Sequence, residues 1–224
     1  KASTKCSRIL WLLRGYRTTR AGGGQMADVW TTVPVLEGAH IVLRPLERAD
    51  GPAIVAAAAD GQLWDLFYTS IPSEATIAAY LDTAEHERAI GRALPLVVIH
   101  KASGRLVGAT RFMRMHKADR RVEIGTTFYA QSVHRTAVNT EAKLLMLRHA
   151  FEVLGCQCVQ FRTDHLNQAS QRAIERLGAK RDGMLRGHRI MNGRVRDTIV
   201  YSILAQEWDG VARNLMLRLA RAER

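Results

Sequence analysis

The chain has 224 residues, of which 47% are hydrophobic and 24% are charged. This composition suits one domain with a full core and excludes a chain that is disordered throughout. The three cysteines have neither the number nor the spacing of a disulfide scaffold or a zinc site, so we expect no metal. Sparse thiols favour a reducing, cytoplasmic compartment, and no stretch approaches the 18 apolar residues of a membrane span.

The formal net charge of +12 is unevenly distributed. Half of the excess lies in residues 1–25, which carry six basic residues and no acidic ones. We interpret 1–25 as a leader or extension outside the fold, 26–212 as one domain, and 213–224 as a basic C-terminal tail. The remaining charge suits a solvated surface as well as an acidic partner, so no nucleic-acid partner is expected.

The first half of the chain alternates strand-like and helix-like patterns. Asp50 is a plausible N-cap for an alanine-rich helix that ends near Asp60, and Ser103-Gly104 marks a turn between two strands. The expected elements are a strand at His40–Leu46, helices at 50–60 and Ile77–Ile90, and strands at Leu94–His100, Leu106–Met115 and Arg121–Tyr129.

The second half continues the alternation. We expect helices at Thr136–Leu154 and Asn167–Leu177, and strands at Cys156–Thr163, Gly183–Met191 and Arg196–Leu204. Asn192-Gly193 between the last two strands is a strong hairpin signal. The order predicts a mixed α/β (α+β) single domain, with a central, mostly antiparallel sheet flanked by about four helices.

Two segments have the pattern of a ligand site. The segment Phe128–Lys143 leads from a strand into a helix, and a helix N-terminus favours phosphate through unpaired N–H groups and the helix dipole. The helix at Asn167–Gly178 begins where its neighbouring strand ends. Ligands of α/β sheets usually lie beyond the carboxyl ends of strands, so both segments are expected to face one crevice.

At these segments the sequence resembles the GNAT acetyltransferase superfamily, and within it the RimJ/RimL branch. Val138–Leu147 reads V-N-T-E-A-K-L-L-M-L, close to the branch pattern V-N-T-E-A-K-x-L-L-L. The branch also has D-x-x-N-x-x-S-x-x-A-x-x-x-L-G, found here as Asp164, Asn167, Ser170, Ala173, Leu177 and Gly178. The strands I-V-L-R-P-L and R-D-T-I-V-Y-S-I-L add to a resemblance that covers about residues 36–209.

The resemblance implies a GNAT-like fold and transfer of an acetyl group from acetyl-CoA to a primary amine, either a protein N-terminus or a small molecule. The family's pyrophosphate loop corresponds to Ser132–Ala137, where only Ala137 fits the pattern. Arg135 replaces a glycine that allows the backbone to approach a phosphate. An arginine is compatible with the loop if its φ is negative and its side chain points outward, where its charge adds a phosphate contact; otherwise it obstructs the site.

The resemblance also assigns roles to individual residues. The backbone of Thr127, Phe128 and Tyr129 binds pantetheine and polarises the thioester carbonyl. Asn167 bonds the pantetheine arm, although asparagine is also a common N-cap, and Ser170 protonates the departing thiolate. The predicted cofactor contacts further include His134, Arg135, Thr136, Ala137, Val138 and Asn139.

Other roles stay open at this point. Glu123 is the candidate proton acceptor, with a surface or paired role as the alternative, and Glu141 is more often structural than catalytic at such a position. The aromatic residues Trp64, Phe67 and Tyr68 line the acceptor side or join the core. A non-catalytic CoA- or RNA-binding module is the alternative function, and a homodimer is common in the family.

Overall fold

The computed structural model describes residues 28–222, so the predicted extension at 1–25 lies outside the described residues. Within this range one sheet has the strand order β1-β2-β3-β4-β5-β6-β8-β7. Every neighbouring pair is antiparallel except β5 and β6, which are parallel. The strands are β1 (Leu36–Glu37), β2 (Ile41–Pro45), β3 (Ala93–His100), β4 (Leu106–His116), β5 (Arg121–Tyr129), β6 (Cys158–Asp164), β7 (Lys180–Met191) and β8 (Arg194–Leu204).

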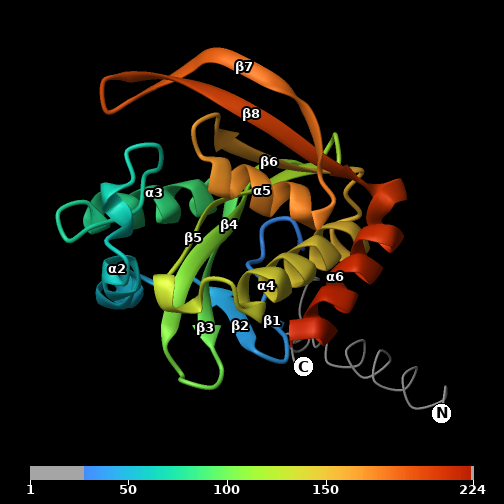
Figure 1. Cartoon of the computed structure of the whole chain (residues 1–224), viewed down its shortest axis with the longest axis horizontal. Helices are drawn as coiled ribbons and strands as arrows, with labels where there is room; N and C mark the ends of the chain where they lie inside the picture. The colour runs from blue at the N-terminus through green and yellow to red at the C-terminus, as the bar shows by residue number, and fades with distance from the viewer. Residues whose placement is uncertain (1–27, 223–224) are drawn as a thin grey trace.

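Helices cover both faces of the sheet (Figure 1). On one face, α2 (Gly51–Ala59) packs against β4 and α3 (Ile77–Ala89) against β3. On the other face, α4 (Ala137–Arg148) packs against β1 and β2, and α5 (Gln168–Leu177) packs against β6. The predicted mixed α/β single domain is confirmed, and the helix that the sequence extended to Leu154 ends in a π-helical turn at His149–Val153.

Helix α6 (Trp208–Ala222) crosses the expected boundary between the domain and the predicted basic tail at 213–224. Its residues Val211, Leu215 and Leu219 are buried, and the helix packs against α4. Their spacing of four residues keeps them on one helical face. The arginines of this segment occupy the remaining faces, and α6 makes five α-helices within the described range.

One buried carboxylate ties helix α4 to the β1–β2 edge of the sheet. The Glu141 carboxylate of α4 accepts hydrogen bonds from the backbone N–H groups of Ala39, His40 and Ile41 at 2.7–2.9 Å. A Cβ atom on Gly38 would lie 2.4 Å from this carboxyl group, so only glycine fits there. Glu141 therefore has a structural role in joining α4 to the sheet, as the sequence favoured.

Candidate active site

The site begins where two parallel strands part. β5 and β6 pair at only three positions, from Arg121–Cys158 to Glu123–Gln160. Beyond them, Thr126 and Thr127 lie opposite the single residue Thr110 of β4, which is a β-bulge. Thr126 has φ of +48°, an uncommon conformation for a β-branched residue. The bulge turns β5 away from β6 and opens the sheet at the carboxyl ends of both strands.

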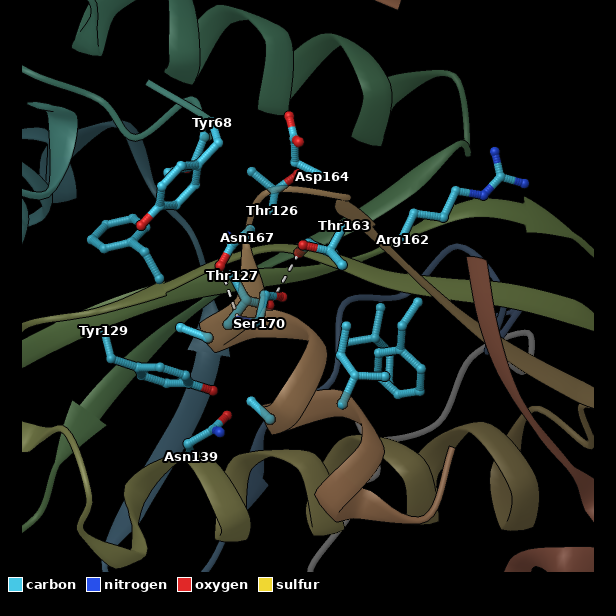
Figure 2. Close-up of a pocket in the computed structure, with 18 of the residues that line it drawn as sticks. Tyr68, Thr126, Thr127, Tyr129, Asn139, Arg162, Thr163, Asp164, Asn167 and Ser170 are labelled. Atoms are coloured by element: carbon cyan, nitrogen blue, oxygen red, sulfur yellow. Dashed lines mark hydrogen bonds between the residues drawn. The ribbon is translucent and has the colours of Figure 1, made fainter. Parts of the chain in front are cut away.

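A cleft of about 650 Å³ occupies this opening. Figure 2 shows it lined by β5, the end of β6, and the first turns of α4 and α5. It brings together most of the residues that the sequence predicted: Glu123, Thr127, Phe128, Tyr129, His134, Arg135, Thr136, Asn139, Asn167 and Ser170. Ala137 and Val138 do not line it, because their side chains pack toward the hydrophobic core.

The loop that precedes α4 is held by side-chain contacts at both ends. Asp60 accepts a hydrogen bond from the Ser132 backbone N–H, and a ring nitrogen of His134 lies 2.8 Å from the Tyr129 carbonyl oxygen. The Thr136 side chain caps α4 by accepting from the Val138 N–H. The loop thus presents the N-terminus of α4 to the cleft, the geometry that suits a phosphate group.

Arg135 has φ of +62°, in the left-handed region that glycine adopts without strain. Of the two conditions for an arginine at this position, a negative φ is therefore not met. The side chain is exposed, however, and it lines the cleft without filling it. The backbone keeps the shape that explains a glycine in the family pattern, and a positive charge is added beside it.

Asn167 and Ser170 begin α5. The Asn167 side-chain oxygen accepts from the Ser170 backbone N–H at 2.9 Å, so asparagine does cap this helix. An amide has a separate NH₂ group with two further donors, and Asn167 lines the cleft. Capping and ligand binding are therefore compatible in the same side chain.

The Tyr129 hydroxyl is buried, and within residues 28–222 it has no hydrogen-bond partner. Such orphaned polar atoms are rare in folded proteins and call for a missing partner. Burial raises the pKa of the Tyr129 phenol, so the hydroxyl keeps its proton at neutral pH. Its ring lines the cleft across from Asn139 (Figure 2). A polar ligand in the cleft would supply the partner, so the residues present fit a molecule such as acetyl-CoA.

Lys143 of α4 is a buried cation that the sequence did not single out. Its Nζ donates to the Thr127 hydroxyl at 3.0 Å, and that hydroxyl lies 2.7 Å from the Thr110 hydroxyl. Burial lowers the pKa of Lys143 to about 7. The lysine links α4 to the bulge of β5 beside the cleft.

Glu123 lies at the last β5–β6 pair and is buried. Its Oε2 contacts Arg114 at 3.1 Å and Arg162 at 3.2 Å. Burial raises the pKa of the Glu123 carboxyl, and these two guanidinium groups oppose the effect. The sequence left two roles open for Glu123, a proton acceptor at the site and a paired carboxylate. The side chain is paired with arginines and also lines the cleft, so both roles are compatible with its position.

The sequence missed a group of cleft residues from distant strands: Arg114, Arg162, His188, Arg189 and Arg196. No motif marks them, because only the sheet brings them together.

Of the three aromatic residues, Tyr68 lines the cleft, Trp64 packs against the core, and Phe67 is 57% exposed. His165 lies beside Asp164 and does not line the cleft.

Within the described range no three His, Cys, Asp or Glu side chains come together as metal ligands. None of the helices between residues 28 and 222 has the length and apolar character to cross a membrane.

The fold and the split between β5 and β6 define an acetyltransferase architecture. The sequence pattern of the acetyltransferase (GNAT) domain matches residues 40–180, and the chain belongs to this family. A GCN5-related N-acetyltransferase from Brucella melitensis is 31% identical, with a TM-score of 0.75 over 84% of this chain and 86% of that one.

A curated relative supports the RimJ/RimL-like branch that the sequence predicted. YdaF of Bacillus subtilis, provisionally named a ribosomal N-acetyltransferase, is 26% identical over 76% of this chain and 94% of its own length. RimJ of Mycobacterium smegmatis, solved with CoA-disulfide, has a TM-score of 0.68 over 80% of this chain and 88% of its own. At 21% identity it is a likeness of fold alone.

Proposed function

We propose that the protein transfers the acetyl group of acetyl-CoA to a primary amine by direct attack of the amine on the thioester. When bound, acetyl-CoA supplies the activated acyl group and a thiolate leaving group. The observation that carries the proposal is the cleft at the β5–β6 split, with an unpartnered Tyr129 hydroxyl inside it. Membership of the acetyltransferase family supports the same chemistry.

The chain's own residues divide the work of binding. The N-terminus of α4 and the charge of Arg135 face the pyrophosphate, together with Thr136 and Asn139. The bulge at Thr126–Thr127 directs backbone groups of β5 into the cleft, where an N–H can polarise a carbonyl oxygen. The Asn167 NH₂ group donates to the pantetheine arm.

Two hydroxyl groups are placed to supply a proton to the leaving thiolate. Ser170, predicted from the sequence, lines the cleft at the first turn of α5, and the Tyr129 phenol lines it from β5. Glu123 is the proposed proton acceptor for the amine. His188 is a second acceptor, because burial first and then the nearby arginines lower its pKa and keep the imidazole neutral.

The non-catalytic alternative rested on the altered loop at Ser132 and Arg135. The positive φ of Arg135 leaves one of the two conditions for an arginine at this position unmet, but its exposed side chain leaves the cleft open. Membership of the acetyltransferase family favours the catalytic function over this alternative. Free thiols at Cys156 and Cys158 suit the cytoplasm, and the homodimer stays a prediction.

The experiment has two readouts. Acetyl-CoA should raise the melting temperature of the protein by binding the folded state, and thiol release should be detected with a panel of primary amines. The variant Asn167→Ala should weaken acetyl-CoA binding, whereas Asn167→Asp should keep the helix cap and lose only the NH₂ donor. Neither a thermal shift at millimolar acetyl-CoA nor thiol release with any amine would refute the proposal.

A further inference from the structure

The face of the sheet opposite α4 and α5 carries an unusual concentration of arginine. Side chains alternate along β6, so Phe161 joins the core while Arg162 and Asp164 share the other face. Figure 2 shows both of these side chains on the side of Tyr68, away from Asn139 of α4. This face of the cleft is therefore separate from the helix N-termini that suit the phosphates.

The sheet register brings further cations to the same face. Asp164 pairs with Thr198 of β8, two residues from Arg196, and Arg196 in turn pairs with Arg189 of β7. Arg114 reaches the face from β4 through its contact with Glu123. We call Arg114, Arg162, Arg189 and Arg196 the acceptor-side cluster, and all four line the cleft.

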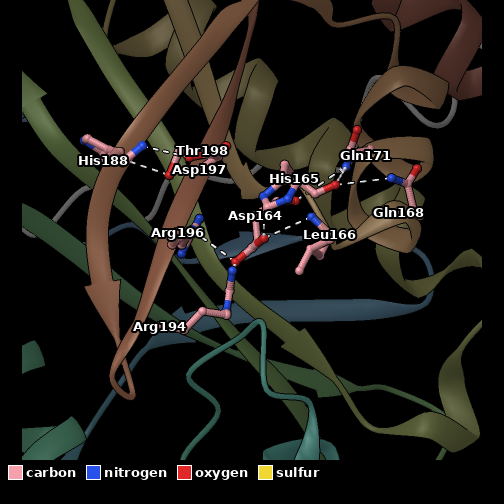
Figure 3. Close-up of polar contacts among 11 residues, drawn as sticks. Asp164, His165, Leu166, Gln168, Gln171, His188, Arg194, Arg196, Asp197 and Thr198 are labelled. Atoms are coloured by element: carbon pink, nitrogen blue, oxygen red, sulfur yellow. Dashed lines mark hydrogen bonds and ion pairs between the residues drawn. The ribbon is translucent and has the colours of Figure 1, made fainter.

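The carboxylates nearby are too few to neutralise these guanidinium groups. Among residues 28–222, Glu123 and Asp164 are the only acidic residues that line the cleft. Glu123 is engaged by Arg114 and Arg162. Asp164 contacts Arg194, which lies outside the cluster, and accepts the Leu166 N–H, as Figure 3 shows.

Arg196 and Arg189 hold the excess positive charge. Arg196 is 13% exposed, lies 3.6 Å from Asp164, and its buried Nε has no hydrogen-bond acceptor within residues 28–222. Burial and the neighbouring Arg189 and Arg194 lower the pKa of Arg196. Arg189 is exposed and forms no ion pair in the described part of the chain. Positive charge gathered on a partly desolvated wall is stabilised when an anion binds there.

The cluster lies under a cover formed by two other segments. The Ser70 hydroxyl lies 3.4 Å from the sulfur of Met191, and the Arg194 guanidinium lies 5.5 Å from the ring centre of Phe67. These contacts bring the tip of the β7–β8 hairpin onto the loop between α2 and α3, whose Tyr68 lines the cleft. A molecule in this part of the cleft would be partly withdrawn from water, where charge-assisted hydrogen bonds are stronger.

We propose that the amine acceptor carries an anionic group, a carboxylate in the simplest case, and that Arg189 and Arg196 bind it. The inference rests on the proposed function and names the chemical class of its substrate. The amine then points from the arginines toward the β5–β6 split, where Glu123 and His188 can take its proton. A free acidic amino acid and a peptide with an acidic residue beside its N-terminus share this chemistry.

The test uses matched pairs of acceptors that differ by one charge. One arm compares the α-amides of glutamate and glutamine, and the other compares C-terminally amidated tetrapeptides with glutamate or glutamine at the second position, so that only the acidic member of each pair has a carboxylate. We expect kcat/KM for acetyl transfer to be at least about tenfold higher for the acidic member, mainly through KM, since one charge-assisted hydrogen bond corresponds to about that factor. The arm with the larger ratio identifies the source of the carboxylate.

Substitutions in strand β7 test whether Arg189 causes the preference for acidic acceptors. Arg189→Gln should bring the acid-to-amide ratio close to one, Arg189→Lys should restore part of it, and Arg189→Glu should reverse it. Arg189 is exposed, so none of these changes removes a buried ion pair. The matched control is Arg186→Gln, an exposed arginine of β7 that does not line the cleft and should leave the ratio unchanged.

Binding of the same pairs, measured by calorimetry without acetyl-CoA, gives a readout that does not depend on turnover. Equal affinity for both members of each pair, or a ratio that survives Arg189→Gln and Arg189→Glu, would overturn the inference. Acetylation of neutral amines without any acid preference would overturn it as well, while leaving the proposed function standing. Acid-selective binding without acetylation would support the inference and count against the function.

Discussion

The two walls of the cleft are built in different ways. The wall formed by α4, α5 and their preceding loops comes from two short, continuous segments, each of which caps its own helix through Thr136 or Asn167. The wall with the acceptor-side cluster comes from β4, β6, β7 and β8, which meet only through sheet register. The residues of the first wall are close together in the sequence and form a recognisable motif. The arginines of the second wall are scattered along the chain and form none.

The difference suggests that the first wall binds the cofactor and the second selects the acceptor. A ligand shared by many enzymes can be held by backbone groups and helix ends, which any sequence with the right turns supplies. A substrate that one enzyme must distinguish needs side chains, whose identity can change without disturbing a cap. We expect substitutions on the first wall to alter stability or cofactor binding, and substitutions on the second to alter acceptor choice.

The anchor of the first wall is Glu141. Glu141→Gln replaces a carboxylate that accepts three backbone N–H groups and brings an NH₂ group against donors. We expect a loss of about 3 kcal/mol in the free energy of unfolding, because hydrogen bonds to charged groups are worth about 1.5–3 kcal/mol. Urea denaturation measures it, with the exposed Glu74→Gln as the control. A loss below about 1 kcal/mol would show that the first wall has another anchor.

Lys143 predicts a pH dependence of stability. Burial lowers its pKa in the folded protein to about 7, below the ordinary lysine value of 10.5, so between these values the unfolded state binds more protons. Stability should therefore rise with pH above about 7, by at most about 1.4 kcal/mol per pH unit. Lys143→Met should remove this slope. Parallel stability curves for the two proteins in urea at pH 6.5 to 9.5 would contradict the prediction.

Tyr129→Phe should separate stability from activity. Removing a buried hydroxyl without a partner should stabilise the unliganded protein by up to about 1 kcal/mol. The same change should lower kcat about tenfold if the phenol supplies a proton to the thiolate, with Ser170 providing the remaining activity. Melting temperature and kcat are the two measurements. A destabilised variant would mean that the hydroxyl has a partner in the free protein.

Arg135→Gly is expected to have the smallest effect. It relieves the left-handed conformation of Arg135, worth about 1–2 kcal/mol, and the greater flexibility of glycine in the unfolded chain offsets part of this gain. Acetyl-CoA binding should become less sensitive to salt, because one cation near the phosphates is lost. Titrations at two ionic strengths test it, and an unchanged salt dependence would place the Arg135 side chain away from the phosphates.

The sequence predicted the elements that depend on local chemistry. Asn192 and Gly193 both have positive φ, as the hairpin signal requires, and Gly178 ends α5 in the left-handed conformation. Helix α6 was missed because its arginines were read as a tail, although Trp208, Val211, Leu215 and Leu219 follow helical spacing.

The candidate site also contains residues that the sequence predicted and residues that it did not. The residues around Asn167 and Ser170 were predicted because helix caps and family motifs are both local. The orphaned Tyr129 hydroxyl and the buried Lys143 were not, since burial and missing partners are properties of three-dimensional packing. Arg189 and Arg196 form a register pair across β7 and β8, which no spacing along the chain reveals.

The short pairing of β5 and β6 links the stability of the protein in the cell to the supply of its ligand. The β5–β6 ladder stops after three pairs and leaves main-chain amides at the centre of the sheet. Under the proposed function, acetyl-CoA would complete this part of the sheet and so be part of the scaffold as well as a reactant. The folded fraction should then follow the supply of acetyl-CoA through mass action. When that metabolite runs short, the enzyme should become more susceptible to proteolysis, and its abundance should follow the nutritional state of the cell.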